Sequence, residues 1–345
     1  MRAALVNRPG PPSVLELAEV PAPECGPGEV LVRVQACGVS SRDIVERNGT
    51  YRRDVSYPLI MGLEISGTVA EVGERVEDLR SGDHVCTKAF ASCGCCRLCR
   101  SGRESTCLRR RPVRGGYGEL TAVAADAVVR VPDEIPFEES CTLGPAAGVA
   151  LNAVRDVARV TVGETVLVTG ASGGVGSPAV QLARLAGARV IALTRDPAKE
   201  AALRADGAEE VIVQSGGEVA ERVRALTGGE GADVVLDTVG SRLFDLCFDS
   251  LAVHGRLALV GELFGEEISI NPARIFFKRA QLLGVGSVSR AQLEDVVALR
   301  AAGRLAVRVA KALPLERVQE AHELVEAAAL PGRVVITHRQ EEVPR

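Results

Sequence analysis

Residues 164–194 carry the pattern that most constrains the fold of this chain. An apolar stretch, ETVLVT, is followed by the glycine turn GASGGVG, then by SPAVQLARLAGA and a second apolar stretch, RVIAL. This order predicts strand, tight turn, helix and strand, which is half of a dinucleotide-binding unit in which Gly173 and Gly176 let the backbone approach a pyrophosphate. Strand-like segments recur at GADVVLDTVG, GRLALVGEL and AQLLGVGSV. We therefore predict an α/β fold with a doubly wound parallel sheet.

The end of the second predicted strand indicates which dinucleotide is bound. Units that bind NAD usually place Asp or Glu about 20 residues after the glycine turn, where it contacts the ribose 2'-hydroxyl. This chain has Thr194 and Arg195 there, followed by Lys199. A hydroxyl, a guanidinium and an ammonium favour a 2'-phosphate, whereas a carboxylate would repel it. We therefore predict NADPH; the alternative is that Arg195 and Lys199 are solvated surface charges and Asp196 binds the ribose of NAD.

Five of the ten cysteines lie in FASCGCCRLCRSGRESTC, residues 90–107. Four of them follow C-x2-C-x2-C-x7-C, a spacing that allows a short loop to surround one tetrahedral ion: Cys93, Cys96, Cys99 and Cys107. Four sulfurs leave no open coordination position, so we predict one structural zinc per chain, with Cys95 as an ordinary thiol. The alternative is four unrelated buried cysteines.

Composition excludes several classes of protein. With 345 residues, of which 46% are hydrophobic and 25% charged, the chain can form two globular domains. A net charge of -4 gives no basic excess for nucleic acid, and the one arginine-dense patch, LRRRPVRGG at 108–116, is short. No apolar run reaches the roughly 18 residues that span a bilayer, and the first residues lack the apolar segment of a signal peptide. We therefore expect a cytoplasmic protein without nucleic-acid or membrane partners, in which clustered thiols are ligands rather than disulfides.

The cysteine lobe, upstream of ASGGVG, together with GLEISGTVAEVG, SGDHV and the closing PGRVVITHR, resembles the medium-chain dehydrogenases/reductases. That family includes zinc alcohol dehydrogenases and zinc-free quinone and enoyl reductases. The resemblance implies a GroES-like distorted β-barrel catalytic domain at 1–147 and 288–345, which contains the zinc lobe, and a Rossmann NADP-binding domain at 148–287. It also implies an active site in the cleft between them and a homodimer or homotetramer.

Three positions depart from the family's alcohol dehydrogenases, which hold a second, catalytic zinc. Ser40, Leu63 and Ala146 stand at the matching ligand positions, and only Glu64 remains. Leu and Ala cannot ligate, and a serine hydroxyl is a poor zinc ligand. We predict chemistry without a catalytic metal; the alternative is a site rebuilt from displaced residues, namely Cys37, His84, Cys86 and Cys141.

The lost ligands favour a particular substrate class. Hydride addition to a simple ketone generates an alkoxide, which benefits from a Lewis acid, whereas addition to a conjugated C=C bond generates a delocalised enolate. We therefore predict a reductase of a small-molecule enoyl thioester, such as acryloyl-CoA, an enone or a quinone. The alternatives are an alcohol/aldehyde oxidoreductase with an atypical site and a non-catalytic nucleotide-binding protein.

Tyr51 is the predicted proton donor. It follows RNGT, where the family's enoyl and quinone reductases carry a similar tyrosine, and a phenol is protonated at pH 7. A role as a loop or pocket-wall residue is the alternative. Ser40 and Asp43 are predicted to bond the substrate or the nicotinamide ribose, or else to form a turn that fixes the cleft wall. Arg42, Arg52 and Arg53 suit an anionic carrier such as CoA, although a solvated loop face is the commoner explanation.

The resemblance also implies a set of cofactor contacts. The backbone of Gly173, Gly174, Val175 and Gly176 would face the pyrophosphate. Val260 and Gly261 would contact the nicotinamide amide, with Ser287 near the same ring. Arg333 would bind a phosphate. For Arg333 the alternative is an exposed charge before the final strand.

Overall fold

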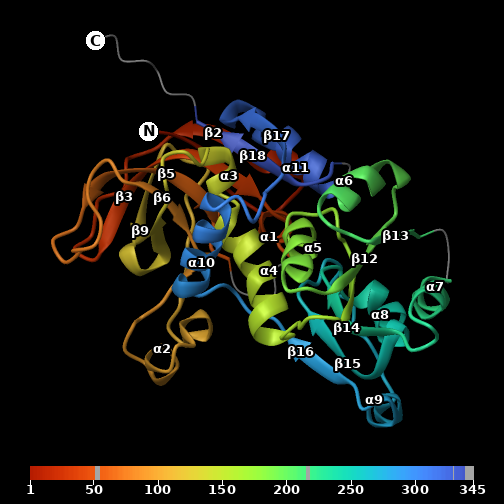
Figure 1. Cartoon of the computed structure of the whole chain (residues 1–345). Helices are drawn as coiled ribbons and strands as arrows, with labels where there is room; N and C mark the ends of the chain where they lie inside the picture. The colour runs from red at the N-terminus through yellow and green to blue at the C-terminus, as the bar shows by residue number, and fades with distance from the viewer. Residues whose placement is uncertain (51–54, 215–217, 329, 339–345) are drawn as a thin grey trace. The chain divides into compact units, whose positions relative to one another are not determined.

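The computed structural model describes residues 1–50, 55–214, 218–328 and 330–338. These residues form two compact units, which are coloured by position along the chain in Figure 1. Unit 1 comprises Met1–Gly148 and Ser287–Arg345, and unit 2 comprises Val149–Gly286. Within the part of the chain that the structure describes, none of the helices has the length and apolar character needed to cross a membrane.

Unit 2 contains a six-stranded sheet in which every pairing is parallel. The strand order is β13-β12-β11-β14-β15-β16, so the sheet is built outward in both directions from β11. The bounds are β11 Thr165–Val168, β12 Arg189–Thr194, β13 Glu210–Val213, β14 Ala232–Asp237, β15 Leu251–Leu259 and β16 Gln281–Gly284. The helices of the unit are α4 Val149–Leu151, α5 Gly176–Leu185, α6 Glu200–Ala205, α7 Val219–Leu226, α8 Phe244–Ser250 and α9 Pro272–Lys278. The predicted doubly wound parallel sheet is confirmed.

The central residues of β11, β12 and β14 are apolar and buried because helices cover a parallel sheet on its faces. Leu167, Ile191 and Leu257 have no exposed surface and pack with Phe244 and Phe248 of α8 in one core cluster. The edge strand β16 differs, since three of its four residues are exposed.

Unit 1 is built on a mainly antiparallel sheet of seven strands in the order β10-β6-β5-β3-β18-β17, with β9 also paired to β3. Two smaller sheets have the orders β2-β1-β4 and β7-β8. The strands are β1 Arg2–Val6, β2 Leu15–Glu19, β3 Glu29–Val39, β4 Leu59–Ile60, β5 Glu64–Val72, β6 His84–Thr87, β7 Phe90–Ala91, β8 Arg111–Pro112, β9 Leu120–Ala124, β10 Val128–Arg130, β17 Val309–Pro314 and β18 Arg333–Thr337. The helices are α1 Ser41–Arg47, α2 Arg97–Arg100, α3 Phe137–Ser140, α10 Arg290–Ala301 and α11 Val318–Glu326. This architecture agrees with the predicted GroES-like domain.

The C-terminal segment completes the sheet of unit 1. Strand β18 pairs antiparallel with β3, with Val334 opposite Val39 and Thr337 opposite Ala36, and parallel with β17. In Figure 1 the blue strands β17 and β18 belong to the same unit as the red and orange strands of the N-terminal part. The two ends of the described chain therefore share one core.

A buried polar network ties α11 to α1. Arg47, which is 1% exposed, donates from Nε to the Gly10 carbonyl at 3.0 Å, and its Nη2 lies 2.5 Å from Oε1 of Glu326. Its Nη1 lies 3.1 Å from Nδ1 of His322, and Nε2 of His322 lies 2.9 Å from the Tyr117 hydroxyl. Burial, together with the charge of Arg47, lowers the pKa of His322 to about 3. His322 is therefore neutral, and because guanidinium only donates, Nδ1 accepts from Arg47 and Nε2–H donates to Tyr117.

Replacing Tyr117 by Phe should destabilise the protein by about 1–3 kcal/mol, because Nε2–H of His322 would be buried without an acceptor. Chemical denaturation monitored by circular dichroism measures this loss. Tyr57→Phe is the matched control, since the Tyr57 hydroxyl donates to the Glu46 carbonyl at 2.7 Å from a half-buried position that water can reach. Equal losses of unfolding free energy in Tyr117→Phe and Tyr57→Phe would show that the Tyr117–His322 hydrogen bond stabilises the protein no more than the accessible Tyr57 bond does.

Candidate cofactor, metal and active sites

The glycine turn between β11 and α5 is shaped by close backbone approach. A Cβ added to Gly176 would lie 2.2 Å from the Gly170 carbonyl oxygen, so only glycine fits at the first residue of α5. The N–H of Gly173 donates to Gly170 at 2.9 Å and closes the turn. Among the described residues, no acceptor is bound by the N–H groups of Gly174 and Val175, and the buried Ser177 hydroxyl also has no partner. Unpaired donors at the start of a helix suit a pyrophosphate, and that contact stays a prediction.

At the end of β12, the guanidinium of Arg195 is available to a ligand, whereas the carboxylate of Asp196 is hydrogen-bonded within the chain. Oδ1 of Asp196 accepts from Ala198 N at 2.9 Å and caps a short 3-10 turn at Pro197–Lys199. Thr194 is 6% exposed, and its hydroxyl accepts from Asp196 N at 3.2 Å. Arg195 is exposed, and its side chain forms no ion pair or hydrogen bond with any residue in the described ranges. This geometry suits a phosphate better than a ribose hydroxyl at Arg195, and the contact with NADPH stays a prediction.

A buried carboxylate that sequence reasoning missed organises the ends of the central strands. Asp237 closes β14, has no exposed surface and accepts from the Thr169 hydroxyl at 2.6 Å and from Val239 N at 3.0 Å; burial raises its pKa. Its own carbonyl accepts from Val260 N at 2.8 Å and Gly261 N at 3.2 Å. The predicted backbone contacts of Val260 and Gly261 to a nicotinamide would therefore have to come from their carbonyl groups.

The predicted residues Ser40 and Asp43 form the N-terminal cap of α1. The amide and hydroxyl of Ser40 donate to Oδ2 of Asp43 at 2.8 and 2.6 Å, and Asp43 N donates back to the Ser40 hydroxyl at 3.4 Å. Asp43 is fully buried, which raises its pKa, and its Oδ1 has no partner in the described chain. The pair thus has a structural role; a contact with substrate stays a prediction. Tyr51 lies outside the described residues, and Ser287 belongs to unit 1.

The positions of the lost zinc ligands are buried and largely apolar. Leu63 is 3% and Ala146 is 1% exposed. Beside Leu63, Oε1 of the buried Glu64 pairs with Nη2 of Arg333 at 2.8 Å. Burial raises the pKa of Glu64 to about 7 although Arg333 opposes the shift, and Oε2 of Glu64 has no partner among the described residues.

Two hypotheses from the sequence concern this region: that Arg333 is an exposed charge, and that His84 belongs to a rebuilt metal site. The alternative that Arg333 is an exposed charge is wrong, because its side chain is 12% exposed and is held by Glu64 at the start of β18. The phosphate contact of Arg333 stays a prediction. His84 bonds the Ser140 hydroxyl through Nε2 at 3.0 Å, and burial lowers its pKa.

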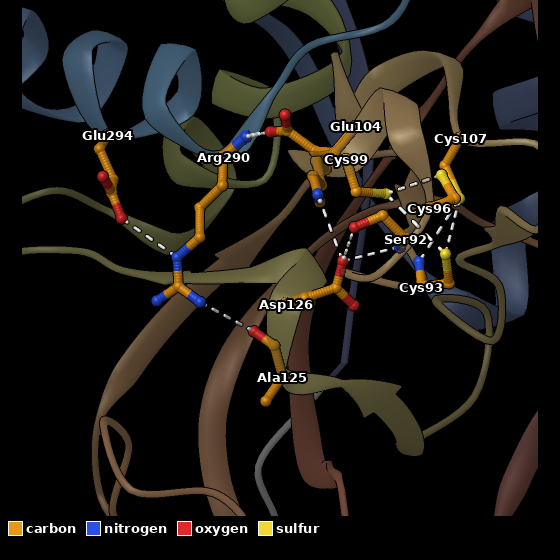
Figure 2. A network of polar contacts seen from close by, with 11 residues as sticks. Ser92, Cys93, Cys96, Cys99, Glu104, Cys107, Ala125, Asp126, Arg290 and Glu294 are labelled. Carbon is orange, nitrogen blue, oxygen red and sulfur yellow. Dashed lines mark hydrogen bonds and ion pairs between the residues drawn. The ribbon is translucent and has the colours of Figure 1, made fainter. Parts of the chain in front are cut away.

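The cysteine lobe brings its four predicted ligands together. The four Sγ atoms lie within 4.8 Å of one another, with 3.4 Å between Cys96 and Cys99 and 3.5 Å between Cys93 and Cys107 (Figure 2). Across the described ranges, no other group gathers three or more metal-ligating side chains in this way. Backbone N–H groups, that of Cys95 first, lower the pKa of Cys93 to about 5, which favours the thiolate. A four-thiolate donor set fits zinc, which would hold the loop closed without taking part in a reaction.

Two carboxylates anchor the lobe to the rest of unit 1 (Figure 2). Asp126 accepts from the amide and the hydroxyl of Ser92, both at 2.7 Å, one residue before the first cysteine. Glu104 accepts from Arg290 N at 2.9 Å at the start of α10, and Arg290 also donates to the Ala125 carbonyl. The lobe is therefore fixed at both of its sides.

We expect one tightly bound zinc per chain. Cys96→Ser should abolish tight binding because zinc in this site needs all four thiolates, whereas Cys95→Ser should keep one zinc, since its exposed thiol lies outside the four-cysteine set. Elemental analysis after dialysis against a weak chelator checks both variants. Two tightly bound zinc ions per wild-type chain, or loss of zinc from Cys95→Ser, would contradict the assignment.

Comparison with known proteins places this geometry in a family. An alcohol dehydrogenase GroES-like domain model matches residues 26–133, and a zinc-binding dehydrogenase model matches residues 174–302. An acryloyl-coenzyme A reductase of Metallosphaera sedula is 32% identical over 98% of this chain and 100% of its own length. An alcohol dehydrogenase of Geobacillus stearothermophilus is 33% identical, covering 97% of this chain and 99% of the relative.

Solved structures agree with the sequence matches. The crystal structure of AibC superposes with a TM-score of 0.92 at 40% identity, covering 99% of this chain and 96% of the other. A mycobacterial protein complexed with NADPH gives a TM-score of 0.84 at 29% identity, covering 98% and 100%. The chain therefore belongs to the medium-chain dehydrogenase/reductase family of oxidoreductases.

Proposed function

We propose that the protein is an NADPH-dependent reductase of activated C=C bonds, acting on an enoyl thioester, an enone or a quinone without a catalytic metal. The observation that carries this proposal is the replacement of zinc-ligand positions by side chains that cannot ligate, Leu63 and Ala146, both buried. The likeness to an acryloyl-coenzyme A reductase at 32% identity supports the same substrate class.

The proposed reaction needs one hydride and one proton. A dinucleotide held by the residues of the glycine turn and by Arg195 would supply the hydride for the β-carbon of the conjugated C=C bond, whose π electrons would move toward the carbonyl. The enolate that forms is delocalised, so hydrogen-bond donors can stabilise it without a Lewis acid. Tyr51 then either donates its phenolic proton to the α-carbon or hydrogen-bonds to the enolate oxygen while water protonates the α-carbon, and that proton completes the reduction. Ser40 and Asp43 hold the start of α1, eight residues or more before Tyr51 in the chain.

A carbonyl/alcohol oxidoreductase is the second candidate, supported by the 33% identity to an alcohol dehydrogenase. That reaction would develop an alkoxide, whose concentrated charge benefits from a metal ion or an equivalent acid. The side chains of Leu63 and Ala146 have no donor atom for such a metal ion, and this argues against the second candidate.

We also propose that the chains associate as dimers or tetramers. The support is the edge strand β16, whose residues are mostly exposed and which has only one pairing partner, β15, among the described strands.

Arg195→Asp should lower the preference for NADPH over NADH at least tenfold. The substitution removes a charge-assisted contact worth about 1.5–3 kcal/mol and adds repulsion toward the 2'-phosphate. The ratio of kcat/KM for the two cofactors measures the change. Arg222→Asp, at an exposed arginine of α7 in the same unit, controls for net charge. An unchanged ratio in Arg195→Asp would mean that Arg195 does not contact the phosphate.

Purified protein should oxidise NADPH with enoyl-CoAs, enones or quinones, and a chelator that leaves the lobe zinc in place should not abolish turnover.

Tyr51→Phe should lower kcat roughly 100-fold while the Kd for NADPH stays nearly unchanged, because the lost group acts on the substrate. Tyr57→Phe serves as the control. Ready oxidation of simple alcohols, with no reaction on any activated alkene or quinone, would overturn the proposed function.

A further inference from the structure

Two loops of unit 2, which follow β14 and β15, are joined by one exposed carboxylate, that of Glu262. Its Oε2 accepts from Ser241 N at 2.8 Å, and its Oε1 accepts from the Ser241 hydroxyl at 3.0 Å. Oε1 also accepts from the N–H groups of Phe264 and Gly265, at 2.9 and 2.8 Å. These four hydrogen bonds to a single side chain connect the loop after β14 with the loop after β15.

The backbone lets the two loops approach each other closely. Gly240 has a φ of 102°, a region that favours glycine, and a Cβ at this position would lie 2.5 Å from Oε2 of Glu262. Leu263 N donates to the Val239 carbonyl at 3.0 Å and adds a direct backbone contact between the loops. The carboxylate of Glu262 therefore fits a place that the chain leaves for it.

Glu262 is ionised in this arrangement. Partial burial raises its pKa, but the hydrogen bonds that it accepts from the N–H groups of Phe264, Ser241 and Gly265 outweigh this effect, so the pKa lies below its usual value. All of these groups donate to the carboxylate, and an ionised carboxylate only accepts. The charged form is therefore the form that holds the loops together.

The strand order indicates what these loops face. The sheet grows in both directions from β11, with β12 on one side and β14 and then β15 on the other. Ligands of such sheets lie outside the carboxyl ends of the strands, where the strand order reverses. The glycine turn after β11 is predicted to hold the pyrophosphate, and Arg195 after β12 the 2'-phosphate. The nicotinamide half would then extend the other way, over the ends of β14 and β15.

The segment between β15 and Glu262 offers two hydrogen-bond acceptors there. The N–H groups of Val260 and Gly261 both donate to the Asp237 carbonyl, at 2.8 and 3.2 Å. Their own carbonyl groups accept no hydrogen bond from any residue in the described ranges. Carbonyl oxygens suit the NH2 group of a carboxamide, which is a donor. Because Glu262 follows Gly261 directly in the chain, the loop that it holds determines the direction of these carbonyl groups.

We propose that Glu262 is a positioning residue for the nicotinamide half of the cofactor: by joining the two loops, it holds the carbonyl groups of Val260 and Gly261 in place for the carboxamide. This inference rests on the proposed function, because it requires a nicotinamide cofactor. Glu262 acts through the backbone and not through the reacting atoms. Acceptors that are already in place cost little conformational entropy on binding, and a correctly oriented ring favours hydride transfer.

The test is Glu262→Gln, which keeps the size of the side chain. In either orientation the amide turns its NH2 group toward a backbone N–H that Glu262 now accepts, so at least one contact between or within the loops is lost. The Kd for NADPH should rise roughly tenfold. The Kd for adenosine 2',5'-bisphosphate, which has the 2'-phosphate but no nicotinamide, should change by less than about twofold. Calorimetric titration measures both.

Glu267→Gln is the matched control. Glu267 is an exposed carboxylate of the same loop, and its side chain contacts no residue in the described chain, so this variant removes the same charge alone. Its Kd for NADPH should stay within about twofold of the wild-type value. An equal loss in this control, or an equal loss of adenosine 2',5'-bisphosphate binding in Glu262→Gln, would show a charge effect or a general loosening of unit 2 and would overturn the proposal.

Turnover separates the positioning role from the proposed function. With an activated alkene, Glu262→Gln should lower kcat roughly tenfold, leave the KM for the alkene nearly unchanged and increase the isotope effect of NADPH deuterated at the transferred hydride. Loss of NADPH affinity alone in Glu262→Gln, in a protein that reduces no activated alkene, would support the positioning role while overturning the proposed function. Wild-type NADPH affinity and turnover in Glu262→Gln would overturn the positioning role while leaving reduction of activated alkenes intact.

Discussion

Unit 1 depends on the ladder that joins β18 to β3, because this pairing closes its sheet with a strand from the far end of the chain. All of unit 2 lies between the two strands in sequence. Closing so long a loop costs chain entropy, but the cost grows only slowly with loop length, and buried apolar strands offset it. The network of Arg47, His322 and Tyr117 adds directional contacts at the same junction. A neutral histidine is the form that satisfies both neighbours there.

The same ladder determines the chemistry near the lost ligand positions. Arg333 begins β18 and Glu64 begins β5, so closure of the sheet brings a cation against a buried carboxylate. Removing both charges from water is costly, and the remaining Oε2 of Glu64 is left without a partner in the described chain. Leu63 and Ala146, which are both buried, offer no donor atom to a metal.

The cysteine lobe places a set of four possible zinc ligands directly before an arginine-rich segment. A loop with so few buried side chains would gain stability from an ion surrounded by the four thiolates. Cys107, the last of these thiolates, lies directly before the run of arginines, and the β7–β8 ladder continues the same rigid segment past Phe90.

Local patterns determined much of this protein. The order of strands and glycine turn in 164–194 predicted the parallel sheet, and the spacing of four cysteines predicted a cluster that the structure brings together, because both signals depend on neighbouring residues. Only the tertiary structure revealed Asp237 as the acceptor that joins three strand ends, the pairing of Arg333 with Glu64, and the meeting of Arg42 with Arg110 on Phe90. Each of these contacts joins residues far apart in the chain, and sequence spacing carries no information about which distant side chains will share one buried or charged environment.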